Sequence, residues 1–246
     1  MMALDNPSEM PQSRGLTVGQ LSEISDEEFA KLMKSDPEFQ AILTNSLIGA
    51  IVCGDAKHVE SLLSNDAVDI NNPDNFGTPL MHAIANGQQN IVKTLLTDSR
   101  IDVNANIKSN GMTAFMLAAV CNDVKSIKAL LENKDTDVNR QDCLGRTALM
   151  YLTLPEPPLI DRKRGNSVEA IKILLEDERV NADIRNNDGL SAEDMAAKYG
   201  FIKIKEFLKA ARAVNAAKQS DSVYNSGGIA AANCDKAIKS SGRSGL

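Results

Sequence analysis

The chain has 246 residues, of which 27 are Lys or Arg and 33 are Asp or Glu, giving a formal net charge of −6 and a pI near 5.1. A hydrophobic content of 43% excludes wholesale disorder, and a mean hydropathy of −0.22 without a long apolar run excludes a membrane-spanning helix. With six Phe, three Tyr and no Trp, extensive base stacking is disfavoured. Two His leave little material for acid–base catalysis or a metal site. The four Cys include no CxxC pair, which disfavours a disulfide scaffold and a metal site.

The first 43 residues are more acidic than the rest of the chain. They carry eight acidic and three basic side chains, whereas 44–212 is nearly balanced. Residues 1–20 are polar and lack a basic-then-apolar pattern, so we expect a disordered start without a secretory signal. In 21–43, Ser25 and Glu28 form a capping box for one short helix, and a second follows Pro37. We interpret 21–43 as a helical cap over the first repeat, with a separate interaction module as the alternative.

A pattern of Thr followed by a short apolar run recurs along the middle of the chain. A Leu-Leu pair lies 17 and 18 residues after each of the first two threonines. After the third threonine, the corresponding pair comes ten residues later. Each copy ends in a segment rich in Asp and Asn, and a further copy without the Thr-Pro start occupies 45–71. The copies begin at Thr78, Thr113, Thr147 and, more weakly, Ser191.

Each copy has the signals of a helix, a turn and a second helix. Thr is a good N-cap, and Pro79 is suited to the first helical turn. The second helix of the same copy carries Ile91, Val92, Leu95 and Leu96, the spacing of a buried stripe. Neither helix is long enough to be stable alone in water, so the copies must stack on one another.

These residues resemble the ankyrin repeat family. Thr78-Pro-Leu-Met-His-Ala is similar to the family's TPLHxA motif, with Met81 in place of the His, and the Asp-Val-Asn endings match too. The resemblance implies an all-α fold, an ankyrin-repeat α-solenoid of about five helix-turn-helix repeats with short hairpin loops over 44–212. The repeats are expected at 45–77, 78–112, 113–146, 147–190 and 191–212.

Two further expectations concern the hairpins of these repeats. In the family, the His of the motif helps to fix the hairpin. Methionine occupies that position in the second, third and fourth repeats, so the resemblance implies looser hairpins. His82, one residue later, stands where the family has a buried Leu and is expected to face the core.

An insert at 155–165 interrupts the fourth repeat between its two helices. Three prolines exclude a helix there, so the insert is expected to form a loop. Its basic cluster, Arg162, Lys163 and Arg164, either binds an acidic partner or belongs to a tolerated surface loop. Residues 213–246 are small and polar, and we expect a mostly disordered tail after a last helix that reaches about Lys218.

The resemblance also implies a binding surface. In this family, side chains just before the Thr, at the end of the first helix and on the hairpins face a concave groove. The corresponding strip is apolar in its middle and polar at its edges, as is typical of protein interfaces. The predicted partner-binding residues are Asn75, Met112, Val120, Cys121, Leu144, Arg146, Leu190, Lys198 and Tyr199, and the same strip contains Leu154, Asn187 and Asp188.

We therefore interpret the chain as a non-enzymatic protein–protein interaction module or adaptor that uses no cofactor and no metal. The expected partner is another protein, with no nucleic acid and no membrane insertion, and the chain is expected to be a cytoplasmic monomer. Because such repeats also occur in proteins that intracellular bacteria send into host cells, an effector in the host cytosol is a further interpretation. The alternatives are an enzyme or enzyme regulator using Cys143, and a nuclear or nucleic-acid-associated protein using the Arg162–Arg164 loop, which the net charge disfavours.

Removal of both ends, 1–20 and 219–246, is expected to leave the melting temperature unchanged within a few degrees, because neither segment offers a core. Limited proteolysis of the full chain should trim the same segments and leave a stable body. A larger loss of melting temperature on deleting 219–246 would mean that the tail packs against the last repeat.

Overall fold

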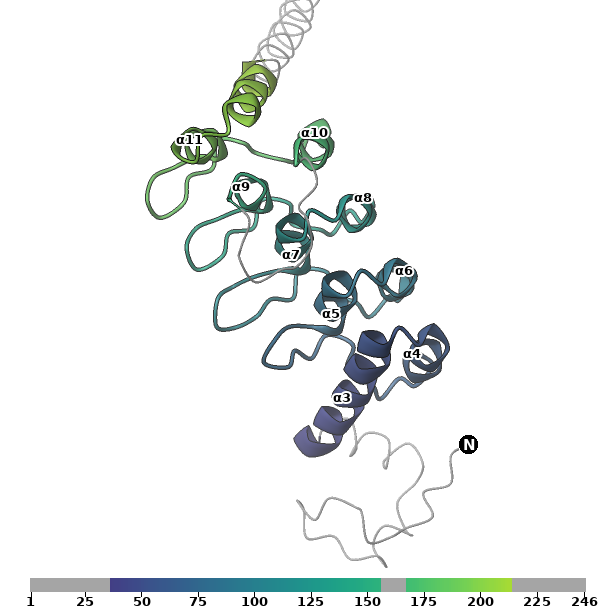
Figure 1. Cartoon of the computed structure of the whole chain (residues 1–246). Helices are drawn as coiled ribbons and strands as arrows, with labels where there is room; N and C mark the ends of the chain where they lie inside the picture. The colour runs from purple at the N-terminus through teal and green to yellow at the C-terminus, as the bar shows by residue number, and fades with distance from the viewer. Residues whose placement is uncertain (1–35, 156–166, 214–246) are drawn as a thin grey trace, which may run out of the picture.

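The computed structural model describes residues 36–155 and 167–213, in which helices pair into five consecutive units (Figure 1). The first helix of each unit lies in one layer and the second in another. The units comprise α3 (Pro37–Cys53) with α4 (Ala56–Leu63), α5 (Pro79–Ala85) with α6 (Gln89–Thr97), α7 (Ala114–Val120) with α8 (Val124–Glu132), α9 (Ala148–Tyr151) with α10 (Val168–Glu176), and α11 (Ala192–Lys198) with a helix over 202–213.

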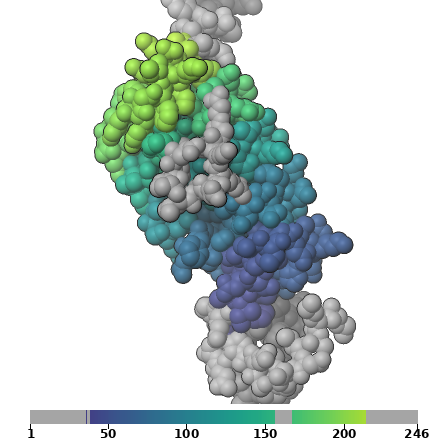
Figure 2. Space-filling view, in the orientation of Figure 1, coloured from purple at the N-terminus to yellow at the C-terminus, as the bar shows by residue number. Residues whose placement is uncertain are grey.

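The units stack in chain order, and each contacts its sequence neighbours. Helices α3, α5, α7, α9 and α11 pack in succession, as do α4, α6, α8 and α10. Hairpin loops project from the layer of first helices (Figure 1), and the surface shows the units as successive bands (Figure 2). The predicted all-α solenoid is confirmed: the described residues contain no named strand and one isolated bridge, Asn106 to Thr113.

The Thr or Ser at the start of units 2 to 5 caps the first helix as the sequence predicts. The Thr78 hydroxyl accepts the N–H of Met81 at 3.3 Å, satisfying one of the free donors of the first turn. Thr113 and Thr147 repeat this bond. Ser191 forms a full capping box with Asp194. Four of the five first helices therefore begin where a side-chain acceptor replaces the missing carbonyl.

The Leu-Leu pairs place one leucine in the core and the other at its edge. Leu95, Leu130 and Leu174 have no exposed surface, and the leucine that follows each of them is half-buried. The methionines at the position of the family's His are 1% exposed and belong to the same core. Deleting such a buried leucine side chain costs about 2–5 kcal/mol, so this stripe dominates the packing between the layers.

An asparagine at the end of each of units 1 to 3 binds the next unit. Asn104, for example, donates from Nδ2 to the carbonyl of Asp135 at 2.7 Å and accepts the N–H of Asp137 at 2.8 Å. Each of these bonds joins a side-chain amide to the backbone of the following unit. The same pair of bonds is made by Asn71 and Asn139.

Two arginines reinforce alternate junctions. Arg179 of unit 4 reaches the end of α8 in unit 3, where its Nη2 donates to the carbonyl of Leu131 at 2.8 Å and its Nη1 to Lys134 at 3.2 Å. Asp177 holds the guanidinium with an oxygen–nitrogen distance of 2.7 Å. Arg100 binds the end of α4 in the same way from unit 2. Each arginine donates to one carbonyl in the last turn of the helix and to one just after it, where carbonyls lack a partner within the helix.

Two helices differ from the sequence prediction. The expected boundary between a cap at 21–43 and repeats from 44 lies inside α3, which is continuous from Pro37 to Cys53. No proline interrupts it after Pro37, and it ends just before Gly54, whose φ is +72°. In unit 4, α9 is a single turn ending at Tyr151, because the insert begins with Pro155 shortly afterwards.

Several predictions fall outside the described residues. These are the disordered start at 1–20, the capping box at Ser25, the insert with Arg162, Lys163 and Arg164, and the tail from 214 onward. The helix at 202–213 continues to the end of the second described range. Within 36–155 and 167–213, no helix is long and apolar enough to cross a membrane.

Replacing Arg179 by Ala is expected to lower the free energy of unfolding by about 1–3 kcal/mol, since helix carbonyls at the junction of units 3 and 4 lose their donor. Arg140→Ala is the matched control, because Arg140 is exposed and its side chain makes no hydrogen bond to the described residues. Its effect should stay within about 0.5 kcal/mol. Urea unfolding of both variants measures the difference; equal effects would show that the arginine bonds do not stabilise the junction.

Candidate functional site

The hairpins are held by side chains that the sequence analysis did not assign to them. Nε2 of His82 lies 3.0 Å from Oδ1 of Asp74 in the hairpin before it. In unit 4 the hydroxyl of Tyr151, at the same position as His82, donates to Oδ2 of Asp142 at 2.6 Å. His82 therefore binds the hairpin instead of facing the core. These two hairpins have a side-chain anchor although the family's His is absent.

Asp142 is the most connected of these hairpin carboxylates. Its Oδ1 accepts the N–H groups of Leu144 and Arg146 at 2.8 and 2.7 Å, and its Oδ2 accepts from Nε of Arg146 at 3.1 Å. Burial raises the pKa of Asp142, but the hydrogen bonds from Tyr151 and from the Arg146 backbone, with the charge of Arg146, outweigh burial and lower its pKa. Burial, and then the bond to Asp142, raises the pKa of Tyr151. The carboxylate stays ionised and the phenol stays protonated.

Adjacent hairpins bind one another through their backbones in units 3 to 5. The N–H of Cys143 donates to the carbonyl of Asn110 at 2.9 Å, and the N–H of Asn187 donates to the carbonyl of Leu144 at 3.0 Å. Gly145 permits this approach: its φ is +74°, and a Cβ there would lie 2.7 Å from the backbone nitrogen of Asn187. The hairpins of units 4 and 5 therefore form one continuous edge.

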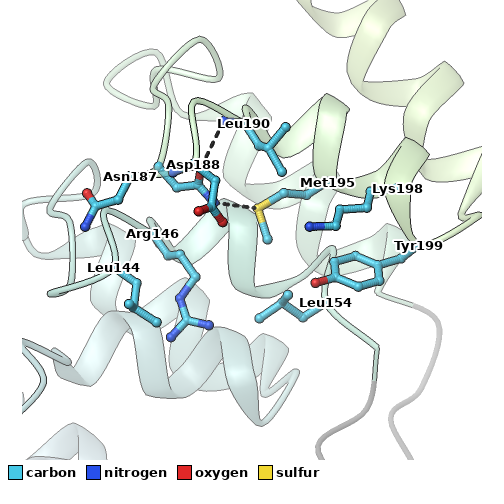
Figure 3. A pocket seen from close by; sticks show the side chains of 10 residues that line it. Leu144, Arg146, Leu154, Asn187, Asp188, Leu190, Met195, Lys198 and Tyr199 are labelled. Carbon is cyan, nitrogen blue, oxygen red and sulfur yellow. Dashed lines mark hydrogen bonds between the residues drawn. The ribbon is translucent and has the colours of Figure 1, made fainter.

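Behind this edge, units 4 and 5 enclose a shallow hollow of about 120 Å³ (Figure 3). Its apolar lining comes from Leu144, which is 55% exposed, from Leu154 and Leu190, which are half-buried, and from the buried Met195. The charged and polar lining comes from Arg146, Asn186, Asn187, Asp188, Lys198 and Tyr199. An apolar floor with charged groups around it is the general form of a peptide-binding surface.

A cation lies over each of two aromatic rings: Tyr199, which lines the hollow, and Tyr151, which does not line it. The guanidinium carbon of Arg146 is 4.7 Å from the centroid of the Tyr151 ring, and Nζ of Lys198 is 6.0 Å from that of Tyr199. Asp142 and the Tyr151 ring together set the direction of Arg146, because the carboxylate accepts from its Nε and the ring lies under its guanidinium carbon. Tyr199 is 40% exposed, so its ring is available at the far wall.

A family model described as ankyrin repeats in three copies matches residues 25–109 and, in a second alignment, 47–142. The chain belongs to the ankyrin repeat family. Among curated proteins, Neurogenic locus notch homolog protein 1 of Xenopus tropicalis is 32% identical over 126 residues. That match covers 51% of this chain but only 4% of the relative, so the relative is far longer than the region it shares.

Ankyrin repeats generally mediate protein–protein interactions and are typically non-enzymatic. The structure of this ankyrin-repeat protein continues the paired-helix unit beyond the matched residues, through units 4 and 5. The hollow therefore lies in the part of the array that the family model does not match.

The hollow brings together five of the nine residues predicted from the sequence: Leu144, Arg146, Leu190, Lys198 and Tyr199. Leu154, Asn187 and Asp188, from the same predicted strip, line it as well. Asn186 and Met195 were not predicted. They occupy the positions of Asp142 and Tyr151 in the next unit, and Nδ2 of Asn186 lies 3.9 Å from the Met195 sulfur. The contact between the hairpin and the first helix identifies these two residues as lining residues, and the repeated spacing in the sequence does not reveal that contact.

The other four predicted residues lie along units 2 and 3, outside this hollow. Asn75 is exposed on the hairpin of unit 2. Met112, Val120 and Cys121 are half-buried, and the first two pack partly against the core. Met112, Val120 and Cys121 are less exposed than Leu144.

Cys143, the nucleophile of the alternative interpretation, is a free and exposed thiol on the hairpin edge. Within the described residues its hydrogen bonds are backbone bonds to the neighbouring hairpins, and His82 is bound to Asp74 in unit 2. No group of three or more His, Cys, Asp or Glu side chains that could hold a metal ion occurs in the same residues.

Acid should destabilise the protein partly through Asp142. A lowered pKa means that the folded state gains stability above the carboxyl's ordinary value of 3.8 and loses it as the pH falls through the lower, folded value. Asp142→Asn is expected to cost about 1–3 kcal/mol at neutral pH and to show a flatter fall of stability below about pH 4. Thermal melting against pH measures this effect, with the exposed Asp188→Asn as control. Parallel pH curves for wild type and Asp142→Asn would contradict the assignment.

Proposed function

We propose that this ankyrin-repeat protein is a non-enzymatic module that binds another protein through its groove, with the hollow of units 4 and 5 as the main contact. The observation that supports the proposal is the exposed Leu144 beside an apolar floor, surrounded by charged groups. A partner side chain that covers this floor removes apolar surface from water. The pre-formed backbone edge limits the ordering cost of binding.

The wider biological role that we propose follows the sequence interpretation. The protein acts as a monomeric cytoplasmic adaptor, or as an effector in a host cytosol, and requires no cofactor and no nucleic acid. The net charge of −6 and the mixed surface of the repeats support a protein partner over a nucleic acid. No part of this role depends on turnover by Cys143.

Leu144→Arg is expected to abolish partner capture from a cell lysate, because it forces a charge into the patch that the partner must desolvate. It should leave the free energy of unfolding within about 0.5 kcal/mol of wild type. Ile42→Arg is the matched control, since Ile42 is equally 55% exposed but lies on α3 at the other end of the array. Met112→Arg is a weaker test, because Met112 is half-buried and the change also strains the core.

Leu130→Ala completes the set by separating stability from binding. Leu130 has no exposed surface, so its truncation should cost about 2–5 kcal/mol of stability while folded protein still captures the partner. Capture and urea unfolding are measured on all variants. Full capture by a folded Leu144→Arg protein would exclude the hollow as the contact, and loss of capture in Ile42→Arg would move the contact toward α3.

A further inference from the structure

Arg146 is oriented but not fully used by the protein itself. Its Nε donates to the buried carboxylate of Asp142 at 3.1 Å, and its guanidinium carbon lies 4.7 Å from the centre of the Tyr151 ring. The Tyr151 hydroxyl is a further hydrogen-bond partner of the Arg146 side chain, which is 25% exposed. A guanidinium that is held at Nε and across its face presents its outer edge in a fixed direction.

That outer edge borders the hollow. Arg146 is one of the lining residues, and Figure 3 shows its guanidinium between Leu144 and Leu154. Two parallel N–H groups at this position match the two oxygens of a carboxylate. Since Asp142 already neutralises Arg146 from within the hairpin, one carboxylate is a better electrostatic match than a more highly charged group.

The remaining charges of the hollow set the orientation of such a ligand. Lys198 and Asp188 are both exposed, and neither makes an ion pair with the described residues. An acidic ligand group is therefore attracted toward Arg146 and Lys198 and repelled from Asp188. The apolar floor between them accepts a neighbouring side chain of the ligand.

We propose that the hollow binds a peptide segment of the partner in which a bulky apolar residue is adjacent to Glu or Asp. The carboxylate binds Nη1 and Nη2 of Arg146, and the apolar side chain packs against Leu144, Leu154 and Leu190. This inference rests on the proposed function of the groove. Asp142 and Tyr151 are positioning residues, because they act on the ligand only through Arg146.

The test begins with a library of short random peptides displayed on phage and selected on the full-length protein, with counter-selection on Leu144→Arg. The expected consensus has an apolar residue next to an acidic one. A fluorescent synthetic peptide of that consensus then gives dissociation constants by anisotropy. Changing its Glu to Gln should weaken binding to wild type about tenfold or more.

Arg146→Lys keeps the charge but not the paired N–H edge, and it should also weaken binding about tenfold. The matched control is Arg140→Lys, an exposed arginine in the same hairpin. The losses from Arg146→Lys and from the peptide Glu→Gln change should not add, because both remove one contact. Melting temperatures confirm that the variants fold, and the Glu→Gln peptide tests the contact without any change to the protein.

Two results would overturn this inference, and they are distinguishable. Peptides that depend on Leu144 but lack an acidic residue, or that bind Arg146→Lys as tightly as wild type, would refute the carboxylate contact and leave the groove function standing. Failure to enrich any peptide that discriminates wild type from Leu144→Arg would count against both the contact and the proposed function.

Discussion

The structure depends on one constraint: the labelled helices of units 2 to 5 are too short to be stable by themselves. The labelled helices of units 2 to 5 have four to nine residues, whereas isolated helices below about 12 residues are marginal in water. Stability must therefore come from burial against the neighbouring units. The fully buried Leu95, Leu130 and Leu174 provide that burial, and the asparagine bridges align the backbones of successive units.

The same constraint makes the hairpins rigid enough to carry a binding surface. A hairpin that projects from a two-layer stack has few apolar contacts of its own, so polar bonds must hold it. Asp142 accepts from two backbone N–H groups, from Tyr151 and from Arg146, and it thereby joins the hairpin to α9. The bond network that stabilises unit 4 is also the one that directs Arg146 toward the hollow.

Unit 4 also departs most from the regular repeat, and this departure shapes the hollow. Its first helix ends at Tyr151, after one turn, whereas α7 and α11 have seven residues each. The chain therefore leaves the helix early, and Leu154 lies half-buried in the lining instead of within a helix. A local interruption of periodicity thus coincides with the hollow of units 4 and 5.

The sequence by itself determined the repeat, the caps and the core. The Thr-to-Leu-Leu spacing is set by the geometry of paired helices, so it predicted the all-α solenoid, the N-caps at Thr78 and Thr113, and the buried Leu130. It also selected most of the strip that lines the hollow, because positions relative to the Thr repeat from unit to unit. Only the tertiary structure revealed that the helix predicted after Pro37 continues past residue 43 to Cys53, since no residue signal separates a cap helix from the helix that continues it. Only the structure showed that Tyr151 and His82 bind hairpin carboxylates, because a residue facing the core and one facing the hairpin can share the same position in the repeat. The direction of Arg146 likewise depends on Asp142 and on the Tyr151 ring, which lie on either side of Thr147 in the sequence. These contacts form only when the hairpin folds back over α9.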